Sequence, residues 1–163
     1  MEIRESFVAP APMAAVWAFF DDISQVSQCV PGLQKLTVVN SDEYKVVIQQ
    51  KLGYFSATFE VNTKREEVEH FRFMRFSSVG RTVKGSVGNL RSSDRVDFTA
   101  LDESTTRVDV HCEPALGGML GAVGHKMILS KSRQMTEQFA AALCAALGGS
   151  KDAGGTPQAS VAP

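Results

Sequence analysis

The feature that most constrains the fold is a change of hydrophobic period along the chain. From Leu33 to Glu113, apolar residues alternate with polar ones, which is the pattern of half-buried β-strands. After Glu113, apolar residues recur at helical spacing in a stripe that includes Ile128, Met135 and Phe139. The sequence therefore predicts a long antiparallel meander followed by one long C-terminal helix.

The residues before this meander predict one strand and two short helices. Alternation from Ile3 to Val8 indicates a strand, and Pro10 and Pro12 end it. Apolar residues at helical spacing follow Pro12, which suits a first helical turn. Asp22 and Gln25 then match a capping box, so a second short helix is expected to start there.

The meander is expected to contain six strands. Turn-like breaks fall at residues 40–42, 51–53, 65–67 and 102–104, and the later strands carry Phe71 and Phe73, then Val96, Phe98 and Ala100, then Val108, Val110 and Cys112. Together with the first strand, these six give a curved seven-stranded antiparallel sheet. The last helix is expected from about Leu116 to Leu147, which is long enough to lie across that sheet. This order of elements predicts an α+β domain whose sheet wraps around the C-terminal helix.

Length and composition fit one domain and a tail. The chain has 163 residues, 44% of them hydrophobic, and residues 1–147 are expected to form the domain. Residues 148–163, rich in Gly, Ala, Ser and Pro, are expected to be a flexible tail. A net charge of −1 argues against nucleic-acid binding. Since no secretion signal or stretch of ~20 apolar residues is found, a cytoplasmic location is expected. The basic segment described below adds an expectation of peripheral contact at the inner membrane face.

The covered face of such a sheet can enclose a cavity. Phe55, Phe59, Phe73 and Phe98 are expected at neighbouring inward positions, facing a helix stripe with flexible methionines. A filled core is the alternative at each position, and the cavity is inferred from the architecture. The residues expected to line it are Phe19, Phe55, Phe59, Phe73, Phe98, Val110, Met119, Val123, Met127 and Met135.

Four glycines separate the meander from the helix stripe, namely Gly117, Gly118, Gly121 and Gly124. Their order is not G-x-G-x-x-G and no second parallel strand follows, which argues against a dinucleotide loop. Missing side chains allow the sheet or a ligand to approach the backbone closely. Gly117, Gly118 and Gly121 are therefore expected at the mouth of the cavity.

No metal site or catalytic residue is predicted. His111 and Cys112 are adjacent in a strand and point to opposite faces, so they cannot share a metal ion. If the cavity were an active site, the candidates would be His111, Glu113 and Arg95, although surface roles are favoured. The three cysteines lack C-x-x-C spacing and are expected to be reduced and buried: Cys29, Cys112 and Cys144.

A basic segment lies between Glu69 and Asp94, which have no acidic residue between them. A solvated loop and strand face would account for it. The functional alternative is contact with anionic lipid headgroups or an acidic partner. The residues predicted to dock on a transient membrane surface or a partner are Arg81, Lys84 and Arg91.

Several blocks of the sequence carry a family resemblance over about residues 2–147. The most specific is Cys29-Val30-Pro31-Gly32-Leu33. The others are residues 7–12 with Val16-Trp17 and Asp22, Phe59, Thr106-Arg107-Val108, and residues 117–124. On these residues the chain resembles the G-subunit family of carbon monoxide dehydrogenase, within the START-like and polyketide-cyclase-like (SRPBCC) superfamily.

This resemblance implies a helix-grip (START-like) fold with a hydrophobic cavity. It also implies an accessory or carrier protein rather than an enzyme, which binds a lipid or respiratory quinone and holds no tight cofactor. The implied partner is a molybdenum hydroxylase of the carbon monoxide dehydrogenase type, served at the membrane. The alternative is a cyclase, dehydratase or hydrolase that acts on an apolar substrate in the same cavity. Titratable side chains converging inside the cavity would favour that alternative.

Overall fold

The computed structural model describes residues 1–84 and 88–148. Within them the chain forms seven strands and three helices. In chain order these are β1 (Ile3–Ala9), α1 (Met13–Asp21), α2 (Ile23–Ser27), β2 (Leu33–Val38), β3 (Glu43–Leu52), β4 (Phe55–Glu69), β5 (Phe73–Lys84), β6 (Gly88–Ala100), β7 (Thr106–Gly118) and α3 (His125–Gly148).

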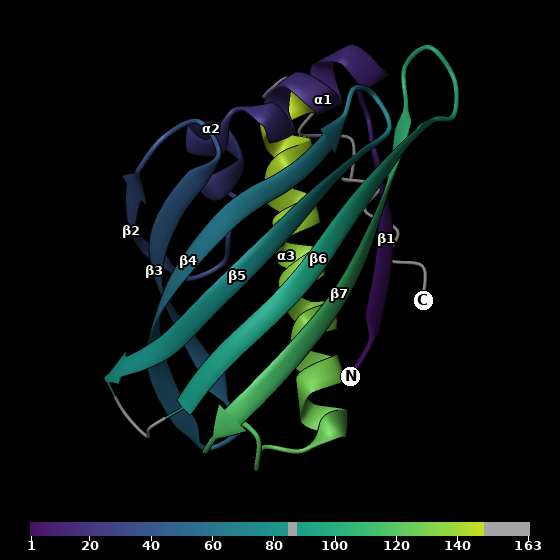
Figure 1. Ribbon diagram of the computed structural model, residues 1–163. Helices are drawn as coiled ribbons and strands as arrows, with labels where there is room; N and C mark the ends of the chain where they lie inside the picture. The colour runs from purple at the N-terminus through teal and green to yellow at the C-terminus, as the bar shows by residue number, and fades with distance from the viewer. Residues whose placement is uncertain (85–87, 149–163) are drawn as a thin grey trace.

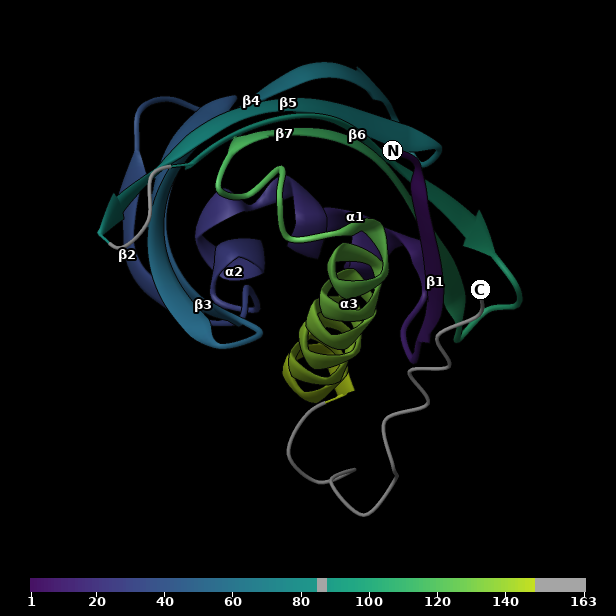
Figure 2. The same cartoon turned by 90° about the horizontal axis from the view of Figure 1, so that it is seen from below.

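All seven strands belong to one antiparallel sheet with the order β1-β7-β6-β5-β4-β3-β2. The sheet curls around α3, and α1 and α2 lie at one end of its concave side (Figure 1 and Figure 2). The predicted α+β fold, a curved sheet around a long C-terminal helix with two short helices after the first strand, is confirmed.

Asp22 positions the two short helices. Its side chain accepts hydrogen bonds from the backbone N–H groups of Ser24, at 3.0 Å, and Gln25, at 3.3 Å. The Gln25 side chain donates back to Asp22 Oδ2 at 2.9 Å. These bonds satisfy donors at the start of a helix, so the predicted helix start at Asp22 is confirmed.

Two clusters of buried apolar side chains occupy the concave side of the sheet. One joins α1, β1, the middle strands and α3, and contains the fully buried Phe7, Met74 and Leu143. The other lies against β3 and β4 and contains Phe59, and it also includes Leu120 from the connection between β7 and α3. The first cluster lies toward the end of the sheet that carries α1, and the second lies toward the end where β7 joins α3.

The C-terminal helix starts later than predicted. Residues 116–118 complete β7, which pairs with β6 as far as Gly118 opposite Gly88, and α3 begins at His125. Gly118 and Gly124 both have positive φ, 62° and 102°, which a helix does not tolerate. The expected flexible tail lies outside the described residues, except for Gly148, which ends α3.

One predicted strand break is wrong. Residues 65–67 do not form a turn, because β4 continues to Glu69 and accommodates a bulge between Arg65 and Glu67. A bulge places an extra residue in a strand without ending it, so it can resemble a break in the alternation. The breaks at 40–42 and 102–104 fall between strands as predicted.

Candidate functional site

A cavity of about 500 Å³ lies between the concave face of the sheet and α3. Its walls come mainly from five strands (β1, β3, β4, β6 and β7) and from α1 and α3, and they include Phe7 of β1, Phe20 of α1, Ile48 of β3 and Ile128 of α3. Most of the lining side chains are apolar. A volume of this size falls within the range of about 300–1,000 Å³ found for small-molecule sites.

Three of the residues predicted to line the cavity do so. Phe59 of β4 and Val110 of β7 line it from the sheet, and Met135 lines it from α3. Phe59 and Val61 lie two residues apart on the same face of β4 and both contribute to the wall. The contact of these residues with a ligand stays a prediction.

Phe19 and Phe98 face inward but belong to the filled core. The ring of Phe98 lies 5.0 Å from the ring of Trp17 and 5.1 Å from that of Phe20, in edge-to-face contacts. Phe19 is buried in the same cluster. Neither residue lines the cavity, so the core alternative holds at both positions.

The prediction for Phe73 is wrong because the residue lies on the opposite face of the sheet. Its neighbour Met74 belongs to the concave core, and side chains alternate between faces along a strand. The guanidinium of Arg95 lies 4.0 Å from the centroid of the Phe73 ring and covers it on the outer face. The side chain of Phe55 lies outside the described part of the chain.

The predicted helix residues near the start of α3 lie beside the cavity rather than in its wall. Met119 and Met127 are 51% and 40% exposed, and Val123 is half-buried. Met127 packs against the β3–β4 turn: its Cε lies 3.1 Å from the position that a Cβ would occupy at Gly53. Leu120, which was not predicted, lines the cavity at this end.

The three glycines predicted at the cavity mouth are not among its lining residues, although their neighbours Leu116 and Leu120 are. Gly117 passes close to β6, since a Cβ there would lie 2.5 Å from Asn89 Oδ1. A Cβ at Gly121 would lie 3.1 Å from the carbonyl oxygen of Leu116. These glycines permit close backbone packing around the end of β7.

The block Cys29-Val30-Pro31-Gly32-Leu33 contributes to the cavity wall. Val30 and Pro31 line the cavity, and Gln50, which also lines it, donates from Nε2 to the Pro31 carbonyl at 2.7 Å. Gly32 has φ of 77°, and a Cβ at this position would lie 2.2 Å from the carbonyl oxygen of Gln49. The block therefore requires glycine where the chain enters β2 beside β3.

Asp94 is a cavity residue that the sequence analysis missed. It is the one acidic side chain among the described residues that line the cavity. Its position could have been found from the sequence, because it shares the β6 face of Val96 and Phe98. Burial raises the pKa of the Asp94 carboxyl, and hydrogen bonds from Ser92 and Cys112 and the nearby His111 partly oppose this effect.

Cys112 lies directly opposite Asp94 on β7 and also lines the cavity. Burial raises the pKa of its thiol strongly, and the neighbouring Asp94 raises it further. A thiol with a raised pKa stays protonated and is a poor nucleophile. Cys112 therefore contributes a neutral, weakly polar surface beside Asp94.

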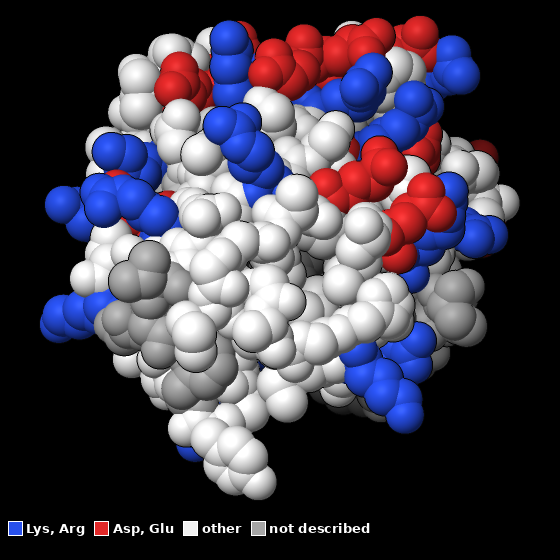
Figure 3. Space-filling view, turned by 60° about the horizontal axis from the view of Figure 1, so that its bottom comes forward, with Lys and Arg blue, Asp and Glu red and all other residues white. Residues whose placement is uncertain are grey.

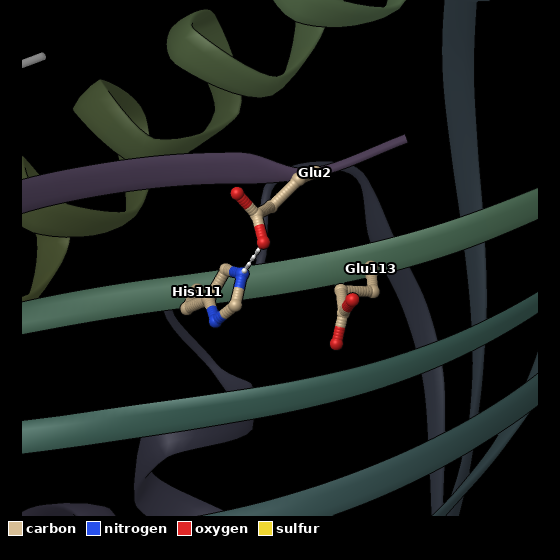
Figure 4. A group of neighbouring side chains, drawn as sticks. All are labelled: Glu2, His111 and Glu113. Atoms are coloured by element: carbon tan, nitrogen blue, oxygen red, sulfur yellow. Dashed lines mark ion pairs between the residues drawn. The ribbon is translucent and has the colours of Figure 1, made fainter.

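The side chains named as catalytic candidates lie outside the cavity. Val110 and Cys112 line it, so His111 and Glu113 point to the outer face of β7, and Arg95 lies on the outer face of β6. Figure 4 shows His111 and Glu113 with Glu2, and Glu2 Oε2 lies 3.0 Å from His111 Nε2. A hydrogen bond from His111 and the charge of Arg4 lower the pKa of the exposed Glu2. Glu2 and His111 therefore form a surface contact, and one ligand atom from each of the three side chains lies within 4.8 Å of the others.

The end of the molecule where β7 joins α3 exposes several large apolar side chains. They are carried by the β3–β4 turn, the end of β5, the residues after β7 and the first turn of α3, which meet at the bottom of Figure 1: Tyr54, Val83, Met119 and Met127. Figure 3 shows a largely uncharged surface on this side, with Lys and Arg at its sides and a mixture of acidic and basic residues above it.

The predicted docking residues lie on the strands beside this apolar end. Arg81, Lys84 and Arg91 are all exposed. Arg81 forms an ion pair with Glu60 at 3.2 Å, which neutralises part of its charge. Among the described residues, no ion pair involves Lys84 or Arg91.

The family model of the carbon monoxide dehydrogenase G subunit (CoxG) matches residues 6–148. This protein belongs to the CoxG family. The match spans the whole sheet apart from the start of β1, and it includes all of the cavity walls except Ile3. Among curated proteins, no sequence matches this CoxG-family chain.

Solved structures confirm the START-like fold. A conserved protein from Geobacillus kaustophilus has a TM-score of 0.83 at 17% identity, covering 93% of this chain and 97% of its own. A START superfamily protein from Mycobacterium smegmatis has a TM-score of 0.66 at 10% identity, covering 90% and 97%. The ZhuI aromatase/cyclase from a Streptomyces species has a TM-score of 0.57 at 13% identity, covering 93% and 94%. At these identities the likeness establishes the fold alone.

The described helices include none that is both long and apolar enough to cross a membrane.

Proposed function

We propose that this CoxG-family protein is a non-catalytic carrier of an apolar small molecule, of the lipid or respiratory quinone type. The observation that carries the proposal is the cavity of about 500 Å³, whose walls are mostly apolar. Burial of apolar surface contributes roughly 25 cal/mol per Å², so such a cavity favours a largely hydrocarbon ligand. The family match supports an accessory role, because CoxG is described as a subunit of carbon monoxide dehydrogenase.

The proposed partner is a molybdenum hydroxylase of the carbon monoxide dehydrogenase type. The proposed site of exchange is the cytoplasmic face of the membrane, which the protein contacts transiently. Exposed Tyr54 and Met119 at the end where β7 joins α3 would enter the lipid interface, while Lys84 and Arg91 contact anionic headgroups. Each basic residue near such a surface contributes ~1 kcal/mol, so contact would be weak and reversible.

An enzyme acting on an apolar substrate in the same cavity is the second candidate. ZhuI and a norcoclaurine synthase from Thalictrum flavum share the fold. Against this candidate, His111, Glu113 and Arg95 all lie outside the cavity. The titratable side chains in the described lining are Asp94, Cys112 and Lys131; Asp94 is the one acid among them, so no pair of carboxyl groups converges there.

Native mass spectrometry of gently purified protein tests the carrier proposal. We expect an added mass on the native protein, and organic extraction of the same sample should release the ligand that accounts for it. The extract is identified by chromatography against lipid and quinone standards. A protein that carries no ligand, and that takes up neither quinone nor lipid from detergent micelles, would contradict the proposal.

Liposome sedimentation tests the membrane contact. Replacing three basic residues by Gln should reduce sedimentation with anionic vesicles at low salt, since these charges are screened as ionic strength rises. The residues are Arg81, Lys84 and Arg91. A charge-matched control changes three exposed arginines near the opposite ends of β5 and β7: Arg72, Arg75 and Arg107. Equal loss in both triple variants would indicate a non-specific charge effect and reject this docking surface.

A pull-down with a molybdenum hydroxylase separates the two kinds of docking. If the first triple variant keeps its vesicle binding but loses the hydroxylase, the same basic residues form a protein-docking surface. The carrier proposal then holds with a different route of delivery.

A further inference from the structure

A row of hydroxyl side chains crosses the concave face of the sheet. Tyr44 on β3 pairs with Thr63 on β4, Thr63 pairs with Ser78 on β5, and Ser78 pairs with Ser92 on β6. Thr63 and Ser78 are buried, and their hydroxyl oxygens share a hydrogen bond of 2.9 Å. Buried hydroxyls cost free energy unless they are paired, so this row is an ordered feature of the interior.

The row ends at Asp94, which is the member that reaches the cavity. The Ser92 hydroxyl donates a hydrogen bond to Asp94 Oδ1. On β6, Ser92 and Asp94 lie between Leu90, which packs against one hydrophobic cluster, and Val96, which belongs to the other. Since Leu90, Asp94 and Val96 all line the cavity, its wall is apolar on both sides of one carboxyl group.

We propose that Asp94 selects the ligand by donating a hydrogen bond to a carbonyl oxygen on an otherwise apolar molecule. This inference rests on the proposed carrier function and names the chemical class of its ligand. Ser92 donates to Oδ1 and the Cys112 thiol also hydrogen-bonds to the carboxyl, so the donor that Asp94 offers to a ligand is the O–H of its protonated form. A ligand without an acceptor would leave this group unpaired in apolar surroundings, which is unfavourable.

The surroundings of Asp94 raise the pKa of its carboxyl, so it stays protonated to a higher pH than an exposed aspartate. Burial raises its pKa, as described above. On the neighbouring strands it lies opposite the neutral Cys112 of β7 and the apolar Phe76 of β5. Burial raises the pKa of Tyr44 on β3, and the charge of Asp94 raises it further. His111 acts on it from the outer face of β7, and Lys131 of α3 lines the same cavity. No direct ion pair with Asp94 is formed within the described residues.

A pair of matched ligands tests the inference directly. The probes are 2,3-dimethyl-1,4-naphthoquinone and 2,3-dimethylnaphthalene, which share one carbon skeleton and differ in the two carbonyl groups. Substitution at both ring carbons of the quinone prevents addition of Cys112 to it. The measured quantity is the ratio of the two dissociation constants, obtained by equilibrium dialysis at mildly acidic pH.

The ratio should respond to the side chain at position 94. Asp94→Leu should shift it toward the hydrocarbon by about tenfold, which corresponds to the net value of one hydrogen bond and one unpaired group. Asp94→Asn should retain the parent preference for the quinone, because its amide donates a hydrogen bond at any pH. Asp97→Leu, the same change on the outer face of β6, should leave the ratio unchanged. Thermal melts confirm that each variant is folded.

The outcomes separate this inference from the proposed function. If neither probe binds the parent protein, the carrier function itself fails. If both probes bind but Asp94→Leu keeps the parent ratio, Asp94 does not hydrogen-bond to the carbonyl oxygen. This inference is then wrong, while the carrier function holds. If Asp94→Leu does not fold, two other results would overturn the inference. One is a parent protein that binds the quinone and the hydrocarbon equally well, and the other is an Asp94→Asn variant that has lost the preference for the quinone.

Discussion

Gly32 shows how a single residue determines the position of a cavity wall. It follows Pro31, which lines the cavity, and its carbonyl accepts a hydrogen bond of 3.0 Å from the backbone N–H of Gln49. Its positive φ and the closeness of the Gln49 carbonyl both require the absence of a side chain. The most specific block of the family resemblance thus contains a backbone constraint as well as two lining residues.

Gly32→Ala should lower the free energy of unfolding by more than about 2 kcal/mol. The left-handed conformation costs about 1–2 kcal/mol, and the 2.2 Å approach to the Gln49 carbonyl adds a clash with backbone. Gly124→Ala is the matched control, because Gly124 also has positive φ but no atom lies within 4 Å of its Cβ position. Urea unfolding measures both. Equal losses would show that the contact with Gln49 adds nothing.

Asp94 should make stability depend on pH. Its folded-state pKa is raised, so stability is greatest below the ordinary value of 3.8 and is lost as the pH rises through the raised value. The amide side chain of the Asp94→Asn variant cannot ionise. Between pH 3.8 and the raised folded-state pKa, the free energy of unfolding of this variant should therefore rise relative to that of the parent, by up to about 1.4 kcal/mol per pH unit. Urea unfolding of both proteins over acidic to neutral pH measures the difference. Glu5, whose pKa burial also raises, titrates in both and cancels. A difference independent of pH would refute the effect.

Among the elements, α3 combines two different environments along one helix. Near its C-terminal end, Ala140, Leu143 and Cys144 are buried in the core. Nearer its start, Ile128 and Met135 border the cavity instead. A side chain beside empty space lacks packing partners on one side, so its contribution to stability is smaller than that of a core residue.

Two alanine substitutions on α3 should therefore have different effects. Leu143→Ala should lower the free energy of unfolding by about 2–5 kcal/mol, since Leu143 is fully buried. Met135→Ala should cost about 1 kcal/mol and mainly change ligand affinity, because it enlarges an existing cavity. Chemical melts and dialysis with 2,3-dimethylnaphthalene measure the two quantities. A Met135→Ala variant as unstable as Leu143→Ala would place Met135 in the filled core.

Hydrophobic period predicted the order of the elements but not all of their ends. The alternation from Leu33 to Glu113 and the later stripe were sufficient for the sheet and its covering helix. The helix start was misplaced because residues 116–124 are uncharged and apolar or glycine, which suits a strand, a loop or a helix equally. Pairing of β7 with β6 decided this, and pairing partners are not visible in one sequence.

The face of a residue was harder to predict than its strand. Phe73 was placed inward by aromatic character, but the pairing along β5 puts Met74 inward, and a one-residue change exchanges the faces. Asp94 was overlooked for the opposite reason, since an acidic residue is expected at the surface. Asp94 lies two residues before Val96, so the alternation along the strand places both on the inner face. The cavity that gives Asp94 a role, however, depends on how α3 packs against the sheet.

At the scale of the whole molecule, the cavity is a consequence of how the layers meet. The α1 and α2 helices and the aromatic core close one end of the curved sheet, and α3 covers its middle (Figure 2). Among the described residues, the other end is covered by the β3–β4 turn and by the connection to α3, where Leu120 packs over Gly88. Apolar space therefore remains between the aromatic core and these connections.

Filling this space should stabilise the protein and abolish ligand uptake. Val110→Phe places a larger apolar side chain into the cavity, where it removes empty volume and gains packing contacts. Val108→Phe is the matched control, because Val108 lies two residues away on the same face of β7 but is fully buried in the core. Overpacking there should cost about 1–3 kcal/mol. Unfolding midpoints and dialysis with 2,3-dimethyl-1,4-naphthoquinone distinguish the two. If Val110→Phe destabilised the protein as much as Val108→Phe did, the space beside Val110 would be filled in solution, and the carrier function would need a different site.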